Sequence, residues 1–307
     1  MNRRTFTKKC LAASSLLLGQ EGMAEDALFI KKIPKTDTHV HLFDLDNLSY
    51  PWLKGAPEIN RNFSIYDFQK ASRRSNIGKI VFMESGAAPA DALREATWVA
   101  TLTRVEPRIK GIIAQVDLSK DNESLRQLDQ LMEISLFRGV RGNFPKDAHQ
   151  SRVFSEGMQR LARHRYSFDL LISAPLMETA VAVAQKHPDN VFILDHLGSP
   201  DIKTNETAAW KKGIKKLAAL PNVHCKLSGM ITRIGKDWSL EQLKSCFYYV
   251  TENFGTDRLV YGGDWPVVLR AGSYQNWSRA FEKLTKNFSR DELHQIYHRN
   301  ADRIYNL

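Results

Sequence analysis

The stretch that decides the fold lies near the N-terminal end of the chain and reads Thr36-Asp37-Thr38-His39-Val40-His41-Leu42-Phe43-Asp44. It places two histidines at positions i and i+2, after a short and partly apolar run. Residues two apart on a β-strand point to the same face, so His39 and His41 should lie side by side. Two such imidazoles can bind one metal ion, or one substrate from one side. The spacing alone is also compatible with two partly exposed polar residues at the end of a strand.

This stretch is the first of eight strand-like segments that alternate with helical ones. The predicted strands are Lys35–His41, Lys79–Glu84, Lys110–Val116, Phe137–Gly142, Ser167–Ser173, Asn190–Asp195, Asn222–Leu227 and Arg258–Gly262. The predicted helices are Ala90–Arg104, Asn122–Ile134, Ser155–Arg163, Leu176–Lys186, Ala208–Leu220 and Leu240–Asn253. The alternation predicts an α/β fold, a closed (β/α)8 TIM barrel. An open doubly wound sheet is the alternative, but no Gly-x-Gly-x-x-Gly follows an early strand.

Composition describes a soluble globular protein without a membrane-spanning helix in its mature form. The chain has 307 residues, of which 43% are hydrophobic and 25% charged, with a formal net charge of +10. The lysines at 211, 212, 215 and 216 lie in a predicted helix and are interpreted as a solvated face, so no nucleic-acid partner is expected. Of the three cysteines, Cys225 and Cys246 are predicted to be free buried thiols.

The first 24 residues are predicted to be an export signal that precedes one barrel domain, 25–307. Arg3 and Arg4 resemble the paired arginines of bacterial Tat signals, and a short apolar region follows from Leu11 to Gly19. Cleavage is expected near Ala24. The protein is therefore expected to use the Tat export machinery and to reside in the periplasm.

Ionisable residues gather at the ends of the predicted strands. In a barrel enzyme the chemistry takes place at the C-terminal ends of the strands, where these side chains would converge. Several ionisable groups on one rim are costly unless they are paired or used. The residues concerned are His39, His41, Glu84, Arg141, Asp195, His196, Lys226 and Asp264.

The order of these motifs resembles the amidohydrolase superfamily, and in particular its amidohydrolase-related branch of fuconolactonase-like and 2-pyrone-4,6-dicarboxylate lactonase-like hydrolases. The resemblance covers the chain from about Lys35 onward. It rests on Asp37-Thr38-His39-Val40-His41, Tyr50-Pro51-Trp52-Leu53, Arg138-Gly139-Val140-Arg141, the run from Leu194 to Pro200, the run from Val223 to Gly229 and the run from Arg258 to Val267. Phe43, Ser199 and Gly263 depart from the pattern of the branch, which leaves the substrate open.

The resemblance implies roles for the residues at the strand ends. Asp264 is expected to be the general base, and His196 to orient or polarise the substrate carbonyl. Arg141 and Lys226 are expected to bind a carboxylate or sugar hydroxyls. One divalent ion, with zinc preferred, is expected on His39, His41, Glu84 and Asp264. Catalysis without a metal is left open, because the branch includes members that use the histidine pair directly on substrate.

The predicted function is hydrolysis of a sugar-acid lactone or a related carboxylated lactone, with this small molecule as the partner. Two alternatives remain at this point. Related barrels with a His-x-His pair and an Asp after strand eight are metal-dependent decarboxylases of aromatic acids. A non-catalytic sugar-binding barrel is the other, although the intact set of His39, His41, His196 and Asp264 argues against it.

Overall fold

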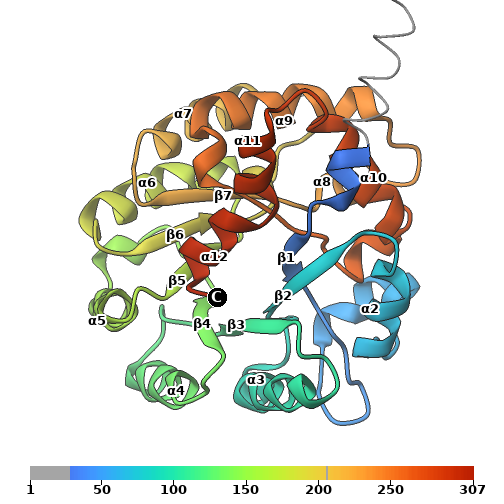
Figure 1. Cartoon of the computed structure of the whole chain (residues 1–307). Coiled ribbons are helices and arrows are strands. Elements are labelled where there is room, and N and C mark those ends of the chain that lie inside the picture. The colour runs from blue at the N-terminus through green and yellow to red at the C-terminus, as the bar shows by residue number, and fades with distance from the viewer. Residues whose placement is uncertain (1–27, 205–206) are drawn as a thin grey trace, which may run out of the picture.

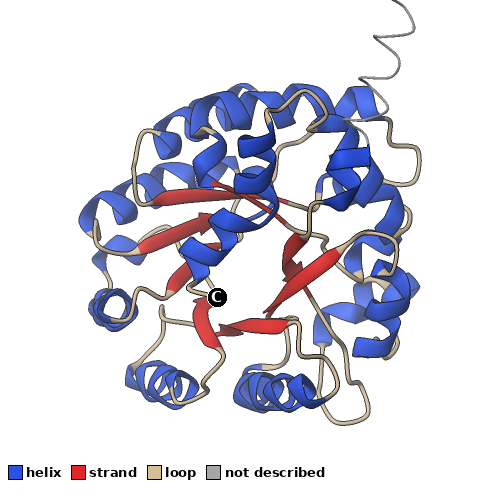
Figure 2. Cartoon of the chain, in the orientation of Figure 1, coloured by secondary structure: helices blue, strands red, loops and turns tan. Residues whose placement is uncertain are grey.

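The computed structural model describes residues 28–204 and 207–307, so the predicted signal peptide, residues 1–24, lies outside the described residues. Its strands are β1 (Lys35–Val40), β2 (Ile77–Met83), β3 (Ile109–Gln115), β4 (Phe137–Arg141), β5 (Ser167–Leu170), β6 (Val191–Leu194), β7 (Val223–Leu227) and β8 (Leu259–Tyr261). They pair in parallel in sequence order, and helices surround them (Figure 2). The predicted (β/α)8 barrel is confirmed.

The barrel closes where the residues after β8 run beside the end of β1. The backbone N–H of Asp264 donates to the His39 carbonyl at 2.8 Å, and that of His41 donates to the Trp265 carbonyl at 2.7 Å. The Thr38 hydroxyl donates to the Tyr261 carbonyl at 2.7 Å. This closure brings the first and the last of the strand-end motifs together, although more than 220 residues separate them in the sequence.

Most of the α-helices pack on the outside of the barrel, and the last one lies across one end of it (Figure 1). The α-helices after β1 are α2 (Ile65–Ser72), α3 (Ala92–Thr101), α4 (Asn122–Met132), α5 (Arg152–Arg163), α6 (Met177–Lys186), α7 (Ala208–Ala218), α8 (Met230–Ile234), α9 (Leu240–Phe254), α10 (Tyr274–Leu284), α11 (Arg290–His294) and α12 (Asn300–Tyr305). The sequence analysis did not predict α2, α8, α10, α11 or α12. Two of them carry a recognisable start signal, since Ser64 with Asp67 and Ser289 with Glu292 form capping boxes.

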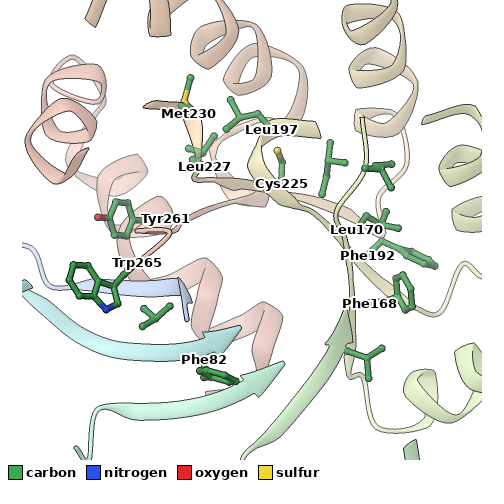
Figure 3. Close-up of a cluster of buried hydrophobic side chains, with 14 of the residues drawn as sticks. Phe82, Phe168, Leu170, Phe192, Leu197, Cys225, Leu227, Met230, Tyr261 and Trp265 are labelled. Carbon is green, nitrogen blue, oxygen red and sulfur yellow. The ribbon is translucent and has the colours of Figure 1, made fainter. Parts of the chain in front are cut away.

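Two hydrophobic clusters stabilise the fold. The larger one lies between the strands and the outer helices, and Figure 3 shows part of it, including Phe82 and Phe192. The smaller one lies inside the barrel and joins strand residues such as Val81 and Val260 to Ile304 and Tyr305 of α12. Figure 1 shows α12 and the C-terminus over the centre of the ring of strands. Because α12 is held by residues at strand starts, including Lys79, it closes the N-terminal end of the barrel.

Cys225 and Cys246 are free and buried, as predicted. On α7, Lys216 forms an ion pair at 2.7 Å with Glu178 of the neighbouring helix α6. Within the described part of the chain, no helix combines the length and the apolar character needed to cross a membrane.

Candidate active site

Three predicted site residues meet at the C-terminal end of the barrel. His39 belongs to β1, His41 follows it, and Asp264 stands in the segment after β8. The Asp264 Oδ1 atom lies 3.7 Å from Nε2 of His39 and 3.8 Å from Nε2 of His41. All three side chains are buried. The i, i+2 spacing therefore places both imidazoles toward one carboxylate, as predicted.

A buried aspartate beneath this group fixes its backbone. The Asp37 carboxylate accepts hydrogen bonds from the backbone N–H of His39 at 3.0 Å and from that of Gly263 at 2.7 Å. It also accepts one from the Tyr274 hydroxyl at 2.6 Å. Asp37 thus connects the histidine strand to the residue before Asp264. Asp37 belongs to the Asp-Thr-His-Val-His motif, but no sequence pattern predicted that it would fix the backbone of the site.

His196 reaches the same site from an unusual turn after β6. Its φ is +52° and that of Leu197 is +55°, in the left-handed region that non-glycine residues rarely adopt. Its Nδ1 lies 2.8 Å from the Ser228 hydroxyl. A Cβ atom on Gly229 would lie 2.4 Å from that Nδ1, and the φ of Gly229 is +65°, so the position requires glycine. Left-handed backbone that the surroundings hold in place is frequent at functional sites.

Arg141 and Glu84 form a buried pair beside the histidines. The Arg141 Nε donates to Glu84 Oε1 at 2.5 Å, and one Arg141 Nη1 atom lies 3.4 Å from His39 Nε2. The second Glu84 oxygen accepts from the backbone N–H of Gly86 at 2.7 Å. Both Glu84 oxygens therefore have partners, and the structure places Glu84 with Arg141 rather than with the histidine and aspartate group that the sequence analysis assigned it to.

Lys226 lies lower in the barrel than predicted. Its Nζ donates to Asp169 at 2.7 Å and lies 2.9 Å from an Asp195 oxygen, and all three side chains are fully buried. Lys226 does not line the cavity described below. The residue faces the barrel interior, where it is paired with the carboxylates of Asp169 and Asp195. A role in direct substrate binding, which the sequence analysis predicted, has no support in this geometry.

Burial sets the protonation states at the site. It lowers the pKa of His39 and of His41 well below the ordinary value, and that of His196 to about 3. These three imidazoles are therefore neutral near pH 7. Burial raises the pKa of Asp264 to about 7. Burial acts on Asp195 in the same direction, but Lys226 and Arg141 outweigh it and hold the pKa of Asp195 at about 2.

A cavity of about 640 Å³ opens above these residues. Its floor is formed by His41, Glu84, Arg141, His196 and Asp264. Its walls include Trp52, Leu171, Thr232, Arg233 and Arg270. None of these wall residues was assigned to the site from the sequence. Thr232 and Arg233 lie in the unpredicted helix α8, and Leu171 was placed in the predicted strand Ser167–Ser173, whereas β5 ends at Leu170. For Trp52 the sequence carries a signal, because its segment Asp44–Ser64 follows the first strand and is too long for an ordinary connection, which predicts that it lies over the active face of the barrel. A cavity of this size accommodates a small organic ligand.

Comparison with known proteins identifies the family. A family model described as amidohydrolase matches residues 36–307. The chain belongs to the amidohydrolase family. This membership confirms the resemblance inferred from the motifs, and it makes the protein a hydrolase.

This amidohydrolase aligns with its relatives over nearly the whole length of each of them. It is 29% identical over 293 residues to the protein y4mH of Sinorhizobium fredii, covering 88% of this chain and 98% of that one. It is 27% identical over 282 residues to an L-fucono-1,5-lactonase of Burkholderia ambifaria, covering 89% and 96%. A solved amidohydrolase of Burkholderia multivorans with bound zinc superposes with a TM-score of 0.78 at 26% identity, covering 89% and 99%.

The donor atoms of this amidohydrolase fit a divalent metal ion. Within the described residues, one ligand atom each from His39, His41 and Asp264 lies within 4.8 Å of the others. Ligand atoms on one tetrahedral zinc ion lie about 3.4 Å apart, so the distances of 3.7 and 3.8 Å from Asp264 to the two imidazoles need only a small contraction. His41 Nδ1 lies 2.9 Å from the Glu84 carbonyl oxygen, which fixes its proton there and leaves Nε2 free to bind a metal.

Proposed function

We propose that this amidohydrolase is a lactonase that hydrolyses a sugar-acid lactone or a related carboxylated lactone. The observation that supports it most is the Asp264 carboxylate, which lines the cavity and whose Oδ1 is within 3.8 Å of the neutral imidazoles of His39 and His41. Relatives named L-fucono-1,5-lactonase support the same reaction class.

The residues on the cavity floor supply what ester hydrolysis requires. Ionised Asp264 can accept a proton from a water molecule as that water attacks the lactone carbonyl. The Arg141 guanidinium and the His196 ring face the cavity and can stabilise the developing negative charge on the carbonyl oxygen. The ring oxygen that leaves remains attached to the product and takes up the proton. A divalent ion on His39, His41 and Asp264, when bound, lowers the pKa of water and polarises the carbonyl.

The cavity walls suggest how a substituted lactone is held. Trp52 presents a partly exposed indole, and Arg233 and Arg270 present guanidinium groups that can bind hydroxyl or carboxylate oxygens. Trp52 is held in place because its Nε1 donates to the Ser85 carbonyl at 2.8 Å. The reacting carbonyl would thus lie on the charged floor, with the substituents of the ring against the walls.

Acid release from a panel of aldonolactones and carboxylated lactones tests this proposal. We expect proton release in a weakly buffered assay for at least one lactone, at a rate proportional to enzyme concentration. Release of CO₂ from aromatic acids without lactone turnover would support the decarboxylase alternative. Binding of sugars with neither activity would support a non-catalytic barrel. Either result would overturn the lactonase proposal.

We further propose that the bound metal is one zinc ion per chain. The purified protein should contain about one equivalent of zinc by elemental analysis, and the double variant His39→Ala with His41→Ala should lose it, because two of the three donor side chains are removed. His164→Ala is the matched control, since His164 is an exposed residue outside the site and its removal should leave the metal content unchanged. A wild-type protein that is fully active after chelation and contains no metal would contradict the proposal.

The export hypothesis remains a proposal supported by the sequence of residues 1–24. Changing Arg3 and Arg4 to lysine should retain unprocessed precursor in the cytoplasm of a bacterial host, because Tat signals depend on the paired arginines. Cell fractionation with detection of the precursor and mature forms measures this. Unchanged processing and export of the variant would argue against the Tat route.

A further inference from the structure

A cluster of buried charges lies directly beneath the cavity floor. Lys226 of β7 donates to Oδ2 of Asp169 on β5 at 2.7 Å, and its Nζ lies 2.9 Å from Oδ1 of Asp195, which follows β6. None of these three side chains has measurable exposure to solvent. Three strands are thus joined inside the barrel by one ammonium group and two carboxylates.

At the end nearer the cavity, Asp195 of this cluster lies next to Arg141 and His39. Oδ2 of Asp195 accepts a hydrogen bond from Arg141 Nη1 at 3.1 Å. Its other oxygen lies 3.8 Å from Nδ1 of His39. This distance is longer than a hydrogen bond, but Nδ1 of His39 has no other partner among the described residues, so Asp195 is the carboxylate placed to orient the ring when His39 binds a metal. Partners of this kind affect metal affinity or activity about 10–100-fold. The position of Asp195 therefore bears on both Arg141 and His39.

The lower end of the cluster is completed by the C-terminal helix. The hydroxyl of Tyr305, the last residue of α12, donates to Asp169 Oδ2 at 3.1 Å. The same oxygen accepts the Lys226 hydrogen bond, while Asp169 Oδ1 accepts one from the Ser167 hydroxyl at 2.8 Å. Tyr305 is buried, and its ring lies 5.7 Å from the Lys226 Nζ.

The helix that carries Tyr305 is tied to the strand starts at several points, and Asn300 at its beginning donates to the Leu259 carbonyl of β8 at 2.8 Å. Lys79 of β2 forms an ion pair at 2.7 Å with Asp302, and Arg138 Nε of β4 donates to the Asn306 carbonyl at 3.1 Å. These contacts fix the height at which the Tyr305 hydroxyl enters the barrel. Hydrogen bonds in a buried charged network strengthen one another, so removing one donor changes the positions of the remaining groups.

We propose that Tyr305 is a positioning residue, which sets the active-site geometry from the opposite end of the barrel through Asp169, Lys226 and Asp195. It touches no substrate. Its hydroxyl holds Asp169, Asp169 and Lys226 hold Asp195, and Asp195 accepts the Arg141 hydrogen bond and lies 3.8 Å from Nδ1 of His39. The predicted effect of Tyr305 on kcat rests on the proposed lactonase function.

The variant Tyr305→Phe tests the proposal, because it removes the hydroxyl and keeps the ring that packs inside the barrel. We expect kcat for a good lactone to fall about tenfold, with KM changed less than twofold. Tyr297→Phe is the matched control: Tyr297 is also buried, and its hydroxyl pairs at 2.8 Å with Thr285, outside the cluster. The control should keep wild-type kcat, and the two variants should melt within a few degrees of each other.

A double-variant cycle separates positioning from simple support of the fold. In an Asp195→Asn background, Tyr305→Phe should lower kcat less than twofold further, because the path to Arg141 and His39 is already broken. A full tenfold effect in that background would overturn the proposal, as would equal kcat values for Tyr305→Phe and Tyr297→Phe. Either result leaves the lactonase function intact if the wild type is active.

Zinc affinity supplies a measurement that does not depend on turnover. Competition with a chromophoric chelator should show about tenfold weaker zinc binding in Tyr305→Phe than in Tyr297→Phe, since only the first substitution shifts Asp195, the carboxylate that lies 3.8 Å from Nδ1 of His39. If the wild type hydrolyses no lactone, the lactonase proposal fails and this difference still decides the role of Tyr305. Equal zinc affinities together with equal kcat values would reduce Tyr305 to a packing residue.

Discussion

Replacing Asp264 by asparagine should lower kcat/KM for lactone hydrolysis by about 10²–10⁴-fold while leaving the fold intact. Asparagine keeps the size of the side chain but cannot accept a proton from water. The backbone bond from residue 264 to the His39 carbonyl, at 2.8 Å, does not involve the side chain. The φ of Asp264 is +58°, and asparagine tolerates this left-handed conformation well. The substitution therefore removes basicity with little added backbone strain.

The same residue predicts the pH dependence of the rate. Burial raises the pKa of Asp264 to about 7. The base must be ionised, so kcat/KM should be highest above that value and should fall as the pH decreases through it and the carboxylate becomes protonated. A bound divalent ion favours the ionised form and should move this limb to lower pH. In the Asp264→Asn variant the residual rate should no longer show this limb.

The measurement is kcat/KM from pH 5 to 9 together with thermal melting of both proteins. Asp129→Asn is a suitable control, because Asp129 lies on the outer helix α4 and pairs with Arg160 far from the cavity. The control should match the wild type in rate and melting. Near-wild-type turnover of Asp264→Asn would remove Asp264 from the mechanism, and a large loss of melting temperature would show a structural role instead.

The sequence predicted the barrel and the residues that converge at its C-terminal end, because both depend on local patterns. Continuous apolar runs such as 191–194 indicate strands buried on both faces, and parallel strands place their C-terminal ends on one rim. His39, His41, His196 and Asp264 stand at such ends, so their convergence follows from topology. The helices that were missed lie mostly after the last strand, where no further strand remained to define their limits.

The partners of individual side chains depend on three-dimensional packing and could not be predicted. Lys226 and Glu84 occupy strand ends like the other site residues. The sequence does not indicate that Glu84 lines the cavity and pairs with Arg141, or that Lys226 pairs with Asp169 below it. Asp169 has the alternation of an inward residue on β5, but only the closed barrel places it next to Lys226 and Tyr305. Charges that pair across three strands and one distant helix leave no periodic signal.

Replacing Lys226 by methionine should destabilise the protein by about 3–5 kcal/mol, because it leaves two buried carboxylates without their shared cation. Methionine approximates the length and flexibility of the lysine stem, so the loss of charge dominates the change. At about 2 °C per kcal/mol for a protein of this size, the melting temperature should fall by about 6–10 °C. Burial raises the pKa of Asp169, so this carboxyl group is the one expected to take up a proton and limit the loss.

The matched control for this experiment is Lys79→Met. Lys79 pairs with Asp302 at 2.7 Å, but both side chains are about one-third exposed, at 34% each. An ion pair with that exposure contributes about 0–1 kcal/mol, so the control should melt within about 2 °C of the wild type. A Lys226→Met variant with wild-type melting and abolished turnover would instead indicate that Lys226 acts on the substrate, as the sequence alone suggested. A large loss of melting temperature in Lys226→Met alone would establish that the barrel interior depends on this cation, because the two substitutions remove the same chemical group.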